Sequence, residues 1–265
     1  MNGRLASLIG IGLLGALVAA ALEPGLRLPL TLALAAASWL LPSGPVRWAA
    51  AAAVPVALIL AWGGLAGGSL PLDGLDCADP LSPLAWLRVA EAATVITLVL
   101  LLARRLGSTL RALGLARPSR PELLAGITAI FIIPIPSLYF GAALAEPFFG
   151  PIRLDLSQPL AFVPALTLAV ANGTMEEVAY RGALMSWMSR ATGPTVALIG
   201  QAIVFGAAHT GTDFVTSPLP VVLTVIAGGL IAGLIVRRTG SLWLPIVVHI
   251  ALDVPLYYAA ACRLP

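Results

Sequence analysis

Two pairs of residues with the spacing of one helical turn are the first features of the chain that suggest chemistry. His249 lies four residues before Asp253, and His209 lies four residues after Phe205, so each pair shares one face of a predicted helix. The His249–Asp253 pair suits a carboxylate that orients an imidazole, or two ligands offered to one metal ion. The chain has two histidines, both in hydrophobic segments. We therefore treat both as candidate functional residues.

Two adjacent glutamates lie in a third hydrophobic segment. Glu176 and Glu177 are neighbours, so on a helix they point about 100° apart and cannot do the same work. Glu177 lies four residues before Arg181, which is the favourable order for an ion pair within one helix. This pairing leaves Glu176 to face a cavity, where its carboxylate can act as a general base. A similar short spacing predicts a structural ion pair between Arg88 and Glu91.

The composition indicates the environment of these helices. Of the 265 residues, 59% are hydrophobic and 10% are charged, whereas an ordinary soluble domain has roughly 45–50% apolar and 25% charged residues. A soluble globule cannot bury so much apolar surface, which excludes a water-soluble enzyme, a disordered chain and a disulfide scaffold. We therefore predict an all-α fold, a polytopic transmembrane helical bundle of about eight to nine spans.

The predicted spans follow one another along the whole chain, and a span needs about 20 apolar residues. Pro134 and Pro136 should kink the fifth of them. Gly229 and Gly233 have the spacing of a close helix–helix contact. The segments cover residues 5–22, 28–41, 48–66, 84–103, 123–145, 159–190, 195–209, 220–236 and 242–261.

Arginine placement predicts the orientation and the organisation of the chain. With nine crossings, ten of the arginines fall on one side, namely those at 4, 47, 104, 105, 111, 117, 120, 190, 237 and 238. The positive-inside rule makes this side the cytoplasm, and the N-terminus is then cytoplasmic. Five of these arginines crowd a basic loop, residues 104–121, which separates N-terminal spans at 1–103 from a catalytic core at 122–265. Cys77 and Cys262 fall on the opposite side, where they can pair or remain two unrelated thiols. No basic run is interleaved with aromatic residues, so we expect no nucleic-acid partner.

Three short motifs resemble those of one family of membrane proteins. The segment MEEVAYRG at 175–182 looks like the Glu-Glu-x-x-x-Arg motif of the CAAX-processing (type II prenyl endopeptidase) and bacteriocin-processing intramembrane proteases, the CPBP family. FGAAH at 205–209 resembles its Phe-x-x-x-His motif, and HIALD at 249–253 resembles its His-x-x-x-Asn/Asp motif. The order and the separations fit, and the resemblance covers about residues 122–258.

The resemblance implies a catalytic cavity inside the membrane and cleavage of a peptide bond in a membrane protein or peptide substrate, of CAAX type or another. It implies that Glu176, with His209, activates a water molecule, while His249 and Asp253 stabilise the oxyanion. Glu177, Arg181 and Phe205 then support the site. An ionised Asp253 cannot donate a hydrogen bond to an oxyanion, as asparagine would. Orienting His249 or binding a metal is therefore a more natural role for it.

The metal dependence and two other functions remain open at this point. Glu176, His209, His249 and Asp253 make a mixed nitrogen and oxygen ligand set for zinc if the enzyme is a metalloprotease, and a metal-free glutamate mechanism is the alternative. The motifs Gly-x-Ser-Gly, His-Glu-x-x-His and Gly-x-Gly-Asp of other intramembrane proteases are absent from the sequence. The same buried Glu, His and Asp residues would also serve a proton or metal transporter, and a non-enzymatic membrane scaffold would not need their chemistry.

Overall fold

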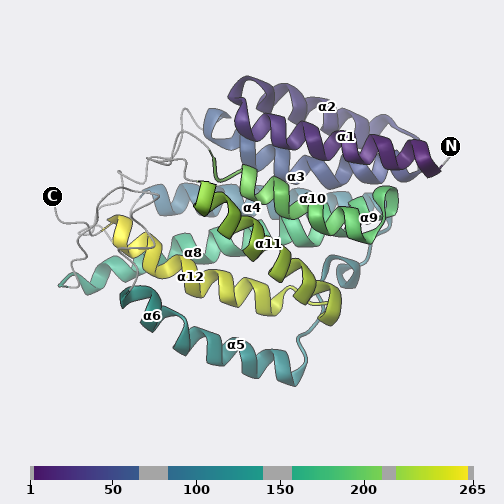
Figure 1. The fold of residues 1–265 in the computed structure, drawn as a ribbon. Helices are drawn as coiled ribbons and strands as arrows, with labels where there is room; N and C mark the ends of the chain where they lie inside the picture. Colours follow the sequence, from purple (N-terminus) through teal and green to yellow (C-terminus); the bar gives the residue numbers. More distant parts are fainter. Residues whose placement is uncertain (1–2, 66–82, 140–156, 211–218, 262–265) are drawn as a thin grey trace.

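The computed structural model describes residues 3–65, 83–139, 157–210 and 219–261, and within them every regular element is helical. The predicted all-α helical bundle is therefore confirmed (Figure 1). Cys77 and Cys262 lie outside the described residues. The longer helices are α1 (Gly3–Leu22), α2 (Arg27–Leu40), α3 (Pro45–Leu65), α4 (Pro83–Leu106), α5 (Arg120–Ile132), α8 (Phe162–Glu176), α10 (Pro194–Ala207), α11 (Leu219–Thr239) and α12 (Trp243–Ala261). The shorter elements are η1 (Pro24–Leu26), η3 (Leu110–Leu113), α6 (Pro134–Tyr139), η4 (Pro159–Ala161), η5 (Glu177–Met185) and α9 (Ser186–Thr192).

Four of the described helices are long and apolar enough to cross a bilayer, judged by length and composition: α1, α3 over Pro45–Trp62, α4, and α11 over Val221–Thr239. Helices α10, over Pro194–Ala207, and α12, over Trp243–Ala259, are also apolar but are shorter than these four. The total of eight to nine spans and the cytoplasmic N-terminus stay predictions.

The segment predicted as one long helix over 159–190 is a continuous helical run through η4, α8, η5 and α9. Its middle part, η5, is π-helical, which we did not predict, and every residue of η5 is buried. π-Helical turns are rare and are found frequently at functional sites. The predicted motif with two glutamates and an arginine straddles the junction of α8 and η5.

Other helices surround this run on several sides. Helices α4 and α12 pack on α8, while α3 and α10 pack on η5 and α9 (Figure 1). The alanines at 49–53 of α3 are fully or almost fully buried, and such small side chains let helix backbones approach closely. One hydrophobic cluster joins residues of both chain halves, including Leu17, Tyr180 and Trp187. The division into 1–103, 104–121 and 122–265 stays a prediction.

Proline and glycine act as the sequence predicts at two places. Helix α5 ends at Ile132 and α6 begins at Pro134, so the predicted kink is a break between two helices. On α11, an added Cβ at Gly229 would lie 3.2 Å from the Cα of Ala202 on α10. An added Cβ at Gly233 would lie 3.0 Å from the Gln201 side chain. The predicted close contact of this glycine pair with a neighbouring helix is therefore confirmed.

Candidate functional site

The ion pair between Glu177 and Arg181 is present and almost completely buried. Nη1 of Arg181 donates to Oε1 of Glu177 at 2.9 Å, and the two side chains are 1% and 2% exposed. The Arg181 guanidinium also lies over the Phe205 ring, 4.3 Å from its centroid. Each charge in this pair is thus balanced by a close partner, as burial of charge requires. The Arg88–Glu91 pair that we predicted is also formed, at 2.6 Å.

His249 of α12 lies between the two neighbouring glutamates. Its Nδ1 donates to Oε1 of Glu177 at 3.0 Å, while its Nε2 lies 3.5 Å from Oε2 of Glu176. The two glutamates leave the helix in different directions, as expected, and reach the two different nitrogens of one imidazole. Glu177 therefore holds the ring in place, and Nε2 is directed toward Glu176.

The orienting partner of His249 differs from the one that the spacing favours. Asp253 shares the face of α12 as predicted, but its Oδ2 lies 3.7 Å from His249 Nε2, which is beyond hydrogen-bond distance. The hydrogen bond comes from Glu177, which is 72 residues away along the chain. Spacing along one helix could not reveal this partner, because it depends on how α8 and α12 pack.

Asp253 has a partner that the motifs did not identify. Nδ2 of Asn172 donates to Oδ2 of Asp253 at 3.0 Å, and both residues are buried. Asn172 lies just before the Glu-Glu-x-x-x-Arg motif and is not part of any of the three motifs. A usable signal was present, because Asn172 precedes Glu176 by four residues and so shares its helix face.

Glu176 ends α8 with a carboxylate that is largely shielded from solvent. Its side chain is 12% exposed, and its Oε2 is buried without a hydrogen-bond partner among the described residues. Most buried polar atoms have such a partner, and exceptions are often functional. This oxygen, next to His249 Nε2, is the group most suited to accept a proton from a bound molecule.

His209 borders the same aromatic ring as Arg181 and His249. It lies just after the end of α10, in the turn that follows Ala207, although we predicted a helix up to this residue. Its Nδ1 donates to the Phe205 carbonyl at 2.8 Å, which makes Nε2 the acceptor nitrogen of the neutral ring. The centroid of the Phe205 ring lies 4.8 Å from that of the His209 ring and 6.1 Å from that of the His249 ring, with interplanar angles of 68° and 83°. Both imidazoles thus lie near one aromatic ring.

Close packing of α8 on α12 brings the cluster together. A Cβ added at Gly173 would lie 3.3 Å from the backbone nitrogen of Ile250 and 3.4 Å from the Cβ of His249. Any larger residue would therefore push α12 away from α8 at the level of the two glutamates. Gly173 is a second residue that motif spacing did not identify.

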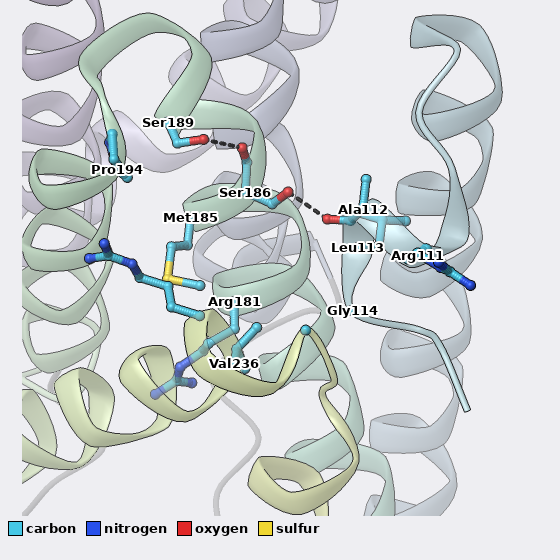
Figure 2. Close-up of a pocket in the computed structure, with 12 residues that line it drawn as sticks. Arg111, Ala112, Leu113, Gly114, Arg181, Met185, Ser186, Ser189, Pro194 and Val236 are labelled. Carbon is cyan, nitrogen blue, oxygen red and sulfur yellow. Dashed lines mark hydrogen bonds between the residues drawn. The ribbon is translucent and has the colours of Figure 1, made fainter. Parts of the chain in front are cut away.

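A cavity of about 190 Å³ borders Arg181 but none of the predicted catalytic residues. It is lined by η3, the end of η5, α9 and the end of α11 (Figure 2). Figure 2 shows hydrogen bonds from Ser186 to the Ala112 carbonyl and from Ser189 to the Ser186 carbonyl, and Arg111 extends away from the other labelled residues. The cavity therefore lies beside the site.

Binding of zinc requires several His, Cys, Asp or Glu side chains close to one point. Among the parts of the chain that the structure describes, no group of three or more His, Cys, Asp or Glu side chains is placed to hold a metal ion. One nitrogen of His249 and one oxygen of Glu177 are already used in a hydrogen bond. Zinc dependence stays a prediction.

One family model matches the chain. It is described as type II CAAX prenyl endopeptidase Rce1-like, and it matches residues 158–255, which contain all three motifs and both histidines. This segment, which is less than half of the chain, is similar to that family and is called the Rce1-like segment below. The resemblance to the CPBP family is therefore confirmed over this segment. No curated protein and no solved structure matches the chain.

The Rce1-like segment includes α8, η5, α9, α10, α11 and most of α12. Helices α1 to α6 lie outside it, so the match is narrower than the range of 122–258 that the motifs suggested. The contacts given above among Asn172, Glu176, Glu177, Arg181, Phe205, His249 and Asp253 lie within the Rce1-like segment. The match and the apolar helices together support an integral membrane protein.

Proposed function

We propose that this protein is an intramembrane endopeptidase that hydrolyses a peptide bond of a membrane-associated protein or peptide, of CAAX type or another. The observation that carries the proposal is the placement of Glu176. Its buried Oε2 lacks a hydrogen-bond partner among the described residues and lies 3.5 Å from Nε2 of a histidine that a second glutamate holds. The Rce1-like match supports the reaction class.

In this mechanism Glu176 accepts a proton from a water molecule whose oxygen attacks the carbonyl carbon of the scissile bond. His209, with Nε2 as acceptor, receives the other O–H of that water and so orients it. The proton held by Glu176 then passes to the leaving amine as the C–N bond breaks, which yields a carboxyl group and an amine. With its ring protonated on both nitrogens, since Nδ1 already donates to Glu177, His249 donates from Nε2 to the oxygen that becomes negative during attack.

The supporting residues keep this geometry in a low-dielectric environment. Glu177 fixes the ring of His249, and Arg181 balances the charge of Glu177, so that Glu176 is the acid available for proton transfer. Without Arg181, two adjacent carboxylates would compete for the same imidazole. The division of work between Glu176 and Glu177 therefore depends on the buried ion pair.

The test uses the purified protein in liposomes with a membrane-anchored fluorogenic peptide, prenylated in one arm and unmodified in the other. We expect cleavage by the wild type and a loss of about 10²–10⁴-fold in kcat for Glu176→Gln, because a general base contributes about that much. Glu23→Gln, the same change at an exposed site after α1, is the matched control and should leave cleavage unchanged. A chelator arm measures metal dependence.

Other outcomes identify the other functions. Proton or metal flux without any cleavage would indicate a transporter, and full tolerance of Glu176→Gln together with no cleavage would indicate a scaffold. Cleavage that survives Glu176→Gln, His209→Ala and His249→Ala would refute the proposed site.

A further inference from the structure

The side chains around the site supply several oxygens that accept hydrogen bonds but few groups that donate them. Glu176, Glu177 and Asp253 contribute three carboxylates to one cluster. An ionised carboxylate has no hydrogen to donate. A peptide carbonyl oxygen that becomes negative next to these groups needs N–H donors, and the Nε2 of His249 supplies one.

Asn172 supplies an amide at the place where a second donor is needed. An ionised aspartate can only accept hydrogen bonds, so the amide of Asn172 must turn its nitrogen, and not its oxygen, toward Asp253. The distance between Nδ2 of Asn172 and Oδ2 of Asp253 is 3.0 Å. A primary amide nitrogen carries two hydrogens, and this contact uses one of them. Among the described residues, Asn172 makes no other side-chain hydrogen bond. The second N–H is therefore available to a bound molecule.

The neighbouring contacts place this amide close to the reacting groups. Asp253 Oδ2, which holds the amide, lies 3.7 Å from Nε2 of His249, and the same Nε2 lies 3.5 Å from Oε2 of Glu176. Asn172 lies one helical turn before Glu176 on α8. The amide, the imidazole and the free carboxylate oxygen thus border one small region.

We infer that Asn172 is a further catalytic residue, whose second Nδ2–H donates to the oxyanion beside His249, with Asp253 holding the amide in position. This inference rests on the proposed endopeptidase function. It gives Asp253 a role that an acceptor-only side chain can fulfil, since it positions Asn172 and does not contact the oxyanion. The donor is carried by α8, and the residue that fixes it is carried by α12.

The experiment compares kcat, KM and thermal stability for four proteins in the same liposome assay. Asn172→Ala removes the donor and should lower kcat by about 10²–10³-fold with a smaller change in KM, as loss of one oxyanion donor does elsewhere. Asn172→Ala combined with Asp253→Asn restores an amide on α12, and we expect kcat to recover to within about tenfold of wild type. Asn172→Ala combined with Asp253→Leu removes the buried charge without an amide and should not recover.

The variants separate a donor from a structural hydrogen bond. If Asp253→Leu restores kcat as well as Asp253→Asn does, the loss comes from an unpaired buried charge and the inference is wrong. A kcat for Asn172→Ala within about threefold of wild type, at equal folded fraction, would also overturn it. If Asn172→Ala does not fold, the comparison of the two double variants still decides the question. Absence of cleavage by the wild type would instead refute the proposed function, and the inference with it.

Discussion

The buried ion pair makes a quantitative prediction about stability. Arg181→Met replaces the guanidinium by an apolar side chain and leaves the Glu177 carboxylate, which is 2% exposed, with the imidazole of His249 as its remaining partner. Removing one member of a buried pair typically costs about 3–5 kcal/mol, because the remaining charge is uncompensated. The guanidinium also lies 4.3 Å from the Phe205 ring centroid, a contact worth about 0.5–2 kcal/mol. The substitution also removes Nε of Arg181, which is buried without a hydrogen-bond partner, and this gain offsets the loss of the ring contact. We therefore expect a total loss of about 3–5 kcal/mol in the free energy of unfolding.

The double variant Glu177→Gln with Arg181→Met isolates the electrostatic part of this loss. Both charges are gone, and the amide oxygen of Gln can still accept from Nδ1 of His249. Replacing a whole buried pair is often nearly neutral, so the double variant should lose only the contact with Phe205, about 0.5–2 kcal/mol. It should therefore be more stable than Arg181→Met.

The measurement is reversible unfolding in mixed detergent micelles, followed by helical circular dichroism as the fraction of denaturing detergent rises. Cleavage of the peptide is measured in parallel but does not enter the comparison. A free energy of unfolding for Arg181→Met within about 1 kcal/mol of wild type would refute the reasoning, since it lies below the range for a broken buried pair. The reasoning would also be refuted if the double variant were no more stable than Arg181→Met.

Two further predictions concern helix packing and pH. Gly173→Ala should cost about 1–3 kcal/mol and lower kcat by up to about 100-fold, because the new Cβ would move α12 and His249. Gly228→Ala, where an added Cβ meets nothing within 4 Å, is the control, and an equal loss there would contradict the packing argument. At the start of α5, the Ser119 backbone N–H donates to the Glu122 carboxylate and holds the pKa of Glu122 below its ordinary value. Wild type should thus exceed Glu122→Gln in unfolding free energy by about 0.3–1 kcal/mol above about pH 5, and this difference should vanish as the pH falls through the lowered pKa. A difference that does not change between pH 7 and pH 3 would exclude this origin.

Features that depend on neighbours within one helix could be predicted from the chain alone. The Glu177–Arg181 and Arg88–Glu91 pairs, the shared face of His249 and Asp253, and the break before Pro134 are all present. Helical geometry relates residues three or four positions apart whatever the rest of the molecule does. Composition likewise determines the environment, because so apolar a chain cannot be buried in a soluble globule.

Contacts between helices were decided by packing. Spacing on α12 favoured Asp253 as the orienting partner of His249, but the hydrogen bond comes from Glu177, 72 residues away. Asn172 joins the site through Asp253, 81 residues away. Both contacts need α8 and α12 to approach as closely as Gly173 permits. Pattern along a single helix carries no information on the relative rotation and separation of two helices, so these partners could be found only once both helices were in place.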